Sequence, residues 1–114
     1  MRIIALMGVA FIFSFVGCKK FRMEPNVPDC IQNSAKDKTK DVSNIYASIL
    51  EYEFQNNVLY VFDLNAGETD ARAEIYSSTC SIYGYLGGPE KNVMVNGEDF
   101  KSAVFKRRVW PLKN

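Results

Sequence analysis

The residues of this sequence with the most reactive side chains are its three cysteines. A thiol can carry a lipid, bind a metal or form a disulfide, and its sequence neighbours help to indicate which. Cys18 follows a long apolar run and precedes two lysines, whereas Cys30 and Cys80 lie in the more polar remainder of the chain. We therefore expect Cys18 to differ in role from the other two.

The chain contains no histidine. Histidine is the commonest general base, proton shuttle and metal ligand of proteins. Its absence excludes triads of serine, histidine and aspartate as well as dyads of cysteine and histidine. Gly84, Gly87 and Gly88 do not form a phosphate loop either, because no lysine with a following serine or threonine opens a helix after them.

Carboxylates remain as candidates for acid and base chemistry or for a metal. Glu51 and Glu53 share one face of an expected strand, and Asp63 is expected on that face too. A further set has the spacing of a calcium loop without its DxDxDG pattern: Asp63, Asn65, Glu68 and Asp70. Spaced acids on a strand are more often a solvated surface. We predict no metal, no cofactor and no enzymatic activity.

The N-terminal apolar run is typical of an export signal. Residues 3–16 carry no charge and follow Met1 and Arg2. The run is shorter than the roughly 20 apolar residues that a bilayer span requires. A positive start and an apolar core of this length are typical of a secretory signal peptide. The sequence therefore predicts a signal peptide over residues 1–17.

The end of this run, FVGC at residues 15–18, resembles the lipobox of bacterial lipoproteins, with Phe15 where leucine is usual. The resemblance implies that Cys18 carries a diacylglycerol, that the chain is cut just before it, and that the new amino group is acylated. Two or more acyl chains hold a protein stably on a membrane. The alternative is a buried thiol in an apolar helix. Lys19 resembles the residue found in lipoproteins that reach the outer membrane of a Gram-negative bacterium.

The rest of the chain divides into a tether and one domain. Residues 18–28 comprise the lipidated cysteine and a flexible tether, because they hold charges, two prolines and no periodicity. Residues 29–114 form a small α+β domain. Loss of Arg2 with the signal leaves 13 basic and 13 acidic residues, so the balance does not suggest a nucleic-acid partner.

The remaining charges are segregated along the chain. Residues 51–99 hold nine acids, and residues 101–114 hold five bases and no acid. We expect the basic final segment to lie across an acidic face of the sheet. The alternative is a basic patch that faces anionic lipid headgroups.

Periodicity predicts one helix followed by strands. A helix is expected over residues 30–40 with Asp29 as its N-cap. Two alternating aromatic runs then predict a hairpin with a three-residue loop, which pairs Phe54 with Val58 and Tyr52 with Tyr60. Further strands are expected over residues 71–76 and 81–86, then a loop to residues 96 and 97, a short helix over residues 98–103 and a last strand ending at Trp110.

These elements predict an α+β fold. One N-terminal helix packs on a four-stranded antiparallel β-meander, and a C-terminal flap of a short helix plus a final strand covers an edge or a face. A domain of this size gains from a covalent link. Export would permit a disulfide between Cys30 and Cys80, worth about 4 kcal/mol for a loop of about 50 residues. The alternative is two free thiols.

A series of short motifs resembles a family of small exported proteins and lipoproteins of Bacteroidota-type Gram-negative bacteria. The motifs occur in the order CI, YEFQNNVLYVF, IY, GG, DF and VW, at Cys30, residues 52–62, Ile75, Gly87, Asp99 and Val109. The family pattern has a cysteine pair after the second strand, where this chain reads NAGETD, so the resemblance leaves the partner of Cys80 open. The family has no established activity to transfer.

Aromatic residues provide the candidate binding surface. Strand alternation places Tyr83 and Tyr85 on one face of the fourth strand and Ile82 and Leu86 on the other, so the two tyrosines are the expected partner surface. The sequence thus favours a lipid-anchored, non-enzymatic envelope protein that binds a protein or an envelope component. The alternatives are a structural accessory subunit of an envelope complex and an enzyme that uses carboxylates.

Overall fold

The computed structural model describes residues 21–112. The predicted signal peptide and Cys18 lie outside the described residues. The described chain contains one α-helix and seven strands, in this order: α2 (Asp29–Lys38), β1 (Ser48–Phe54), β2 (Asn57–Asp63), β3 (Arg72–Ser77), β4 (Ile82–Gly87), β5 (Met94–Val95), β6 (Glu98–Asp99), the 3-10 helix η3 (Phe100–Ser102) and β7 (Val104–Trp110).

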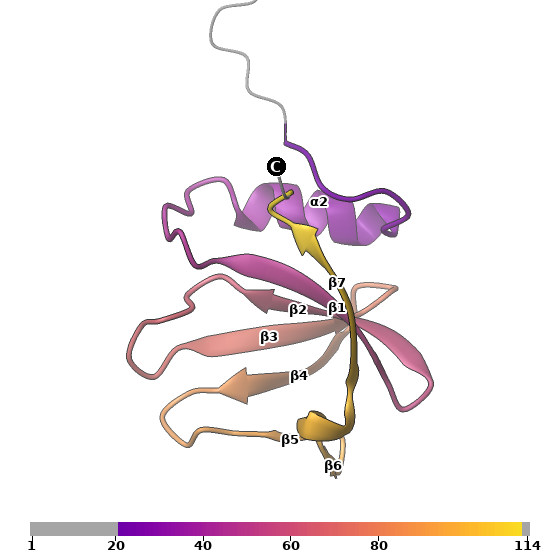
Figure 1. Cartoon of the computed structure of the whole chain (residues 1–114), viewed down its shortest axis with the longest axis vertical. Helices are drawn as coiled ribbons and strands as arrows, with labels where there is room; N and C mark the ends of the chain where they lie inside the picture. Colours follow the sequence, from indigo (N-terminus) through magenta and orange to yellow (C-terminus); the bar gives the residue numbers. More distant parts are fainter. Residues whose placement is uncertain (1–20, 113–114) are drawn as a thin grey trace, which may run out of the picture.

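The main sheet has five antiparallel strands in the order β4-β3-β2-β1-β7 (Figure 1). The α+β class and the four-strand meander are confirmed. Of the two positions predicted for the C-terminal flap, its final strand takes the edge, where β7 pairs with β1 along its length and makes the sheet five-stranded, not four-stranded. Pairing with β7 satisfies the backbone groups of β1 that a four-stranded sheet would leave open at its edge.

The helix precedes every strand but begins at residue 29 of the chain, so it is not N-terminal in the full sequence. Asp29 is its first residue and not its N-cap. Pro28 occupies the N-cap position, and no side chain caps the helix there. Proline has no side-chain acceptor with which to cap the N-terminus. At the C-terminus, the hydroxyl of the C-cap residue Thr39 donates to the carbonyl of Ala35 at 2.7 Å.

The β1–β2 hairpin differs from its predicted register. Phe54 pairs with Asn57 and Tyr52 with Leu59, so the loop contains two residues and not three. Gln55 and Asn56 both have positive φ, 51° and 62°, as a tight two-residue hairpin turn requires. The predicted register assumed one apolar face. β2 is instead the central strand, and its residues 59–62 are all buried, so both of its faces pack against a core.

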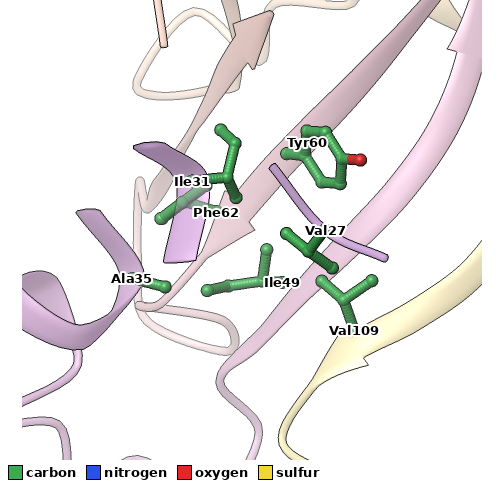
Figure 2. Packing of buried hydrophobic residues seen from close by; sticks show 7 residues of the cluster. All are labelled: Val27, Ile31, Ala35, Ile49, Tyr60, Phe62 and Val109. Atoms are coloured by element: carbon green, nitrogen blue, oxygen red, sulfur yellow. The ribbon is translucent and has the colours of Figure 1, made fainter. Parts of the chain in front are cut away.

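Each face of the sheet has its own core. The helix-side core lies between α2 and the sheet (Figure 2) and contains Val27, Ile31, Ala35, Ile49, Tyr60, Phe62 and Val109. The loop-side core, on the opposite face, contains Phe54, Leu59, Val61, Ala73, Ile75, Val95 and Phe100. One sheet therefore separates two small cores with different covers.

A disulfide joins Cys30 to Cys80, with their Cα atoms 6.1 Å apart, as the sequence predicts. Cys30 lies in the first turn of α2, and Cys80 lies in the turn between β3 and β4, where its φ is 67°. The bond therefore connects the helix to the far half of the sheet and closes a loop with a sequence separation of 50.

The segment before the helix packs on the domain. Phe21 and Met23 lie against the helix-side core, and Val27 belongs to it with 4% exposure. The amide of Glu24 donates to the carbonyl of Val109 on β7 at 3.0 Å. Residues 21–28 are thus not the free tether that their composition suggests. Phe21, Met23 and Val27 lie among prolines and charged residues, so the composition of the segment does not show that it contacts the core.

Candidate binding surface on the loop side of the sheet

The two faces of the sheet are covered to different extents. The helix spans the helix-side face, whereas the loop-side face is covered by the β5–β6 hairpin and η3. Val95 and Phe100 insert from this cover into the loop-side core, with 1% and 7% exposure. The strands of the cover have only two residues each. Part of the loop-side face therefore remains accessible.

Side-chain hydrogen bonds hold the cover to the β1–β2 turn. Gln55 donates from Nε2 to the carbonyl of Asn96 at 3.1 Å and to Oε1 of Glu98 at 3.2 Å. Its Oε1 accepts from Asn96 Nδ2 at 2.9 Å and from the Tyr83 hydroxyl at 2.6 Å. The Gln55 amide thus joins two turns and β4. The positive φ of Gln55 directs its side chain to them from a tight turn.

The β5–β6 hairpin differs from the loop that the sequence predicts at residues 96 and 97, although the sequence contains a hairpin signal there. Asn96 and Gly97 form the turn between β5 and β6, with φ values of 47° and 82°. An Asn-Gly pair between apolar residues is the strongest short-range hairpin signal. The prediction read it as part of a loop because the flanking strands are too short to show alternation.

Shallow depressions surround the cover. One, with a volume of about 400 Å³, is lined by Tyr52, Leu86, Val93, Asp99, Phe100, Lys101 and Ala103. A neighbouring one of about 490 Å³ shares Leu86 and Val93 and extends to the loops that hold Glu68, Asp70 and Lys91. A third, of about 510 Å³, lies at β7 and is lined by Glu24, Leu50, Phe105, Arg107 and Arg108.

Exposed apolar side chains border these depressions. Val93 and Met94, at β5, are 51% and 52% exposed. Val104 and Phe105, at the start of β7, are 57% and 54% exposed. Val93 and Phe105 line the depressions themselves, whereas the other exposed apolar side chains of the described residues, Ile45, Tyr46, Val58 and Ile82, line none of these three.

Tyr83 and Tyr85 do not share a face. A register shift between Ile75 and Tyr76 in the β3–β4 pairing marks a bulge, so the alternation that the sequence implies is broken there. Tyr83 packs against the loop-side core. Tyr85 pairs with Glu74, which alternates along β3 with the loop-side residue Ile75 and so lies on the helix-side face. Both rings are half-buried and engaged within the domain.

Tyr85 belongs to a charged cluster at the end of β4. The Arg72 guanidinium lies 4.1 Å from the centre of its ring and 3.5 Å from Oε2 of Glu90. The Tyr85 hydroxyl donates to the same carboxylate. This bond lowers the pKa of Glu90 and raises the pKa of Tyr85, because it favours the charged acid and the neutral phenol. The cluster fixes the loop after β4 and leaves Tyr85 little freedom as a partner contact.

The basic final segment meets the acids of β1, as its charge predicts. Arg107 Nε contacts Glu51 Oε1 at 2.9 Å, and Lys106 Nζ lies 3.6 Å from Glu53 Oε1. The two acids that the sequence offered as a carboxylate pair are thus each matched to a base. Arg108, the next residue, has a buried Nε without a hydrogen-bond partner in the described chain.

The structure does not assemble the acids into a metal site. Within residues 21–112, no three histidine, cysteine, aspartate or glutamate side chains cluster as metal ligands would. Asp63 alternates with Phe62 of the helix-side core and so lies on the loop-side face, away from Glu51. Burial raises the pKa of its carboxyl.

In the described part of the chain, the structure contains no helix whose length and apolarity would let it cross a bilayer. Searches with this chain against protein-family models, curated proteins and solved structures found no match.

Proposed function

We propose that this protein is a lipid-anchored envelope protein that binds a protein partner and catalyses no reaction. The observation that carries the proposal is the partly covered loop-side face, with Val93, Met94 and Phe105 exposed around it. A lone domain gains nothing from exposing these side chains to water, whereas a partner that covers them gains the free energy of apolar burial.

The route of the chain supports a protein partner over the bilayer. The segment that enters the domain at Phe21 lies at the end that holds α2 and the C-terminus, and the β5–β6 hairpin lies at the opposite end (Figure 1). If Cys18 is lipidated, only residues 19 and 20 separate the anchor from Phe21. An anchor at this end would hold the exposed β5 side chains away from the membrane surface.

Two features weigh against an enzyme built on carboxylates. Glu51 and Glu53 are each paired with a base of β7, so neither carboxylate is free for catalysis. The depressions on the loop side are shallow and bordered by apolar side chains. The Tyr83 hydroxyl there already donates a hydrogen bond to Gln55. A binding role needs no more than this.

A permanent accessory subunit of an envelope complex is the second candidate. The same exposed side chains favour it, because an obligate partner would keep them covered at all times. The two candidates differ in stoichiometry. An accessory subunit is recovered with its partner in a fixed ratio, whereas a binding module is recovered largely free.

Anchoring is tested by growing cells with an alkyne fatty acid and comparing the natural protein with a Cys18→Ser variant. We expect label only in the natural protein, recovered with the outer membrane. Label that survives the substitution would contradict the anchor.

Binding is tested with a photo-crosslinking residue at Met94, and the matched control carries it at Lys36 on the exposed face of α2. We expect discrete crosslinked protein bands in native membranes from position 94 and none from position 36. Equal patterns from both positions would contradict a loop-side partner.

A further inference from the structure

The two edges of the main sheet are finished differently. At β4, the backbone of Asn92 exchanges hydrogen bonds with that of Gly87 at 2.9 and 3.0 Å. The side-chain amide of Asn92 also donates, from Nδ2, to the carbonyl of Tyr85 at 2.8 Å. The loop after β4 therefore occupies that edge at Tyr85 and Gly87, and there the edge offers no template for another strand.

The edge at β7 is occupied only near its C-terminal end. There the amide of Glu24 donates to the carbonyl of Val109 at 3.0 Å, and Arg107 Nη1 donates to the carbonyl of Pro25 at 2.9 Å. Within residues 21–112, no backbone hydrogen bond reaches the outer side of Val104 to Lys106. The chain's own N-terminal segment thus starts to cover this edge and leaves its first half open.

Two features that protect a sheet edge coincide at Lys106, which is a lysine and is also the extra residue of a bulge where the register of β7 against β1 shifts. The bulge shortens the stretch of β7 that a straight strand can follow. A lysine on an edge strand normally deters pairing with another chain. Lys106 instead lies 3.6 Å from Glu53 of β1, so its charge is directed across the sheet. The side chains beside it, Val104 and Phe105, are more than half exposed and apolar. An added strand would cover both of them.

Arg108 indicates the chemistry of that strand. Its Nε is buried and has no hydrogen-bond partner in the described chain, and the residue lines a depression of about 510 Å³. A carboxylate is the acceptor that suits a guanidinium at such a depression best. Leu50 and Phe105 line the same depression. An acidic residue with apolar neighbours matches this lining.

Resting on the function proposed above, we infer that the outer edge of β7 binds an extended segment of the partner protein by strand addition. The segment pairs with the backbone of Val104 to Lys106, places an apolar residue beside Phe105, and places a carboxylate on Arg108. Strand addition obtains affinity from main-chain hydrogen bonds and specificity from side-chain pockets. Glu24 lines the same depression, so its negative charge should disfavour an incoming carboxylate.

Charge distinguishes this occupant from two others. A second copy paired antiparallel through the open half of β7 would bring residues 104–106 of the two copies together, and these residues contain no acid for Arg108. A bilayer of anionic lipid requires a free basic patch, but Lys106 and Arg107 are already paired with acids of β1. An acidic, apolar peptide meets neither difficulty.

The test uses the full-length lipidated protein in nanodiscs of neutral lipid. The probes are labelled synthetic peptides of about six residues, the usual length of a strand, in which valine alternates with threonine. One set carries a central glutamate and the other a central lysine. By fluorescence anisotropy, we expect the glutamate set to bind about tenfold more tightly, as a charge-assisted bond to an arginine would produce.

Variants locate the site. Arg108→Gln should remove the preference for glutamate, Glu24→Gln should strengthen it, and Lys101→Gln, an exposed base outside the strand, should leave it unchanged. An added strand pairs with the edge through every second backbone amide. N-methylation of one alternate set of peptide amides should therefore abolish binding, and N-methylation of the other set should not. Tryptophan fluorescence of Trp110 shows whether each variant has kept its fold, since Trp110 packs on the helix-side core.

Several results would overturn the inference. Equal binding of the two peptide sets would do so, as would a preference for glutamate that survives in a folded Arg108→Gln variant. Binding to phosphatidylglycerol vesicles without binding to peptides would favour a membrane surface. A dimer that the β7 variants dissociate would favour a second copy of the chain. If these occur while Met94 still crosslinks to a partner, strand addition is wrong and the proposed function stands. Loss of the Met94 crosslinks as well would refute the proposed function.

Discussion

The two faces of the central sheet differ in how firmly their covering elements are held. On the helix side, a ten-residue helix, a disulfide and the segment from Phe21 to Pro28 all pack on the same strands. On the loop side, two-residue strands and a single 3-10 turn cover the core, and the amide of Gln55 holds them in place. The difference implies that one face maintains the fold and the other is free to meet a partner.

The largest expected effect comes from the disulfide. Replacing both Cys30 and Cys80 by serine should lower the free energy of unfolding by about 4 kcal/mol, since the bond closes a loop with a sequence separation of 50. Urea unfolding is followed by the fluorescence of Trp110, the single tryptophan, which packs on the helix-side core. The loss should be matched when reductant is added to the natural protein.

Hydrogen exchange on the same variant sharpens the contrast between the faces. Amides of α2 and of the β3–β4 turn should lose protection first, because the bond joins these two elements. If the β5–β6 hairpin lost protection before them, the helix side would not be the face that the disulfide maintains.

A matched pair of core substitutions has the next largest effect. Ile49 on β1 and Ile75 on β3 are both fully buried, on the helix side and the loop side respectively. Ile49→Ala should cost about 3 kcal/mol, and Ile75→Ala about 2 kcal/mol. The cost of a cavity depends on how far its surroundings collapse. The short loop-side cover can move into the space that Ile75→Ala leaves, whereas the helix, fixed by the disulfide, cannot follow Ile49→Ala.

Urea midpoints of the two variants measure this difference, and Ile49→Val with Ile75→Val serve as the milder controls. Equal losses for the two alanine variants would mean that the loop-side cover is as rigid as the helix. The proposed distinction between a permanent face and an adaptable one would then fail.

The sequence predicts the helix side better than the loop side, for a physical reason. The helix, the four meander strands and the Cys30–Cys80 bond all follow from period, turn residues and export chemistry. These signals are local or limited to a few alternatives. The contact between β7 and β1, by contrast, joins Glu53 to Val104 across about half the chain, and no local pattern specifies it.

Local conformation accounts for the other differences. A two-residue turn with positive φ at Gln55 sets the register of β1 and β2, and the alternating pattern of β2 does not reveal that both of its faces are buried. A bulge in β4 then separates Tyr83 from Tyr85, which strict alternation had placed together. Each error came from applying a period of two where one residue departs from it.

Gln55 offers a smaller test of the loop side. Gln55→Gly removes its side-chain bonds to Asn96, Glu98 and Tyr83 but also relieves the strain of a β-carbon at positive φ, whereas Gln55→Ala removes the same bonds and keeps that strain. We expect a loss of about 1 kcal/mol for the glycine variant, with the alanine variant lower by about 1 kcal/mol more.

Hydrogen exchange should place most of that loss in the β5–β6 hairpin, with α2 still protected, because Gln55 holds only the loop-side cover. A uniform loss of protection over both faces would mean that the cover and the helix side unfold as one unit.

The smallest expected effect concerns Asp63, the acid that lies on the loop-side face near Tyr52. Burial raises the pKa of Asp63. Burial also raises the pKa of Tyr52, and the charge of Asp63 raises it further. The folded protein therefore binds the proton of Asp63 more tightly than the unfolded chain does. As the pH rises from below the ordinary carboxyl pKa of about 4 through the raised value, Asp63 lowers the free energy of unfolding, and the loss is complete above that value.

Asp63→Asn removes this dependence, since asparagine stays neutral. The variant should be slightly more stable than the natural protein at pH 7, and the gain should vanish as the pH falls below the carboxyl range, as measured by urea midpoints. Glu68→Gln, at an exposed acid of the neighbouring loop, controls for the loss of one negative charge. A gain that persisted at low pH would come from packing. A bound partner that covers the loop-side face should bury Asp63 further, and the contribution of this carboxyl would then weaken binding as the pH rises through the same range.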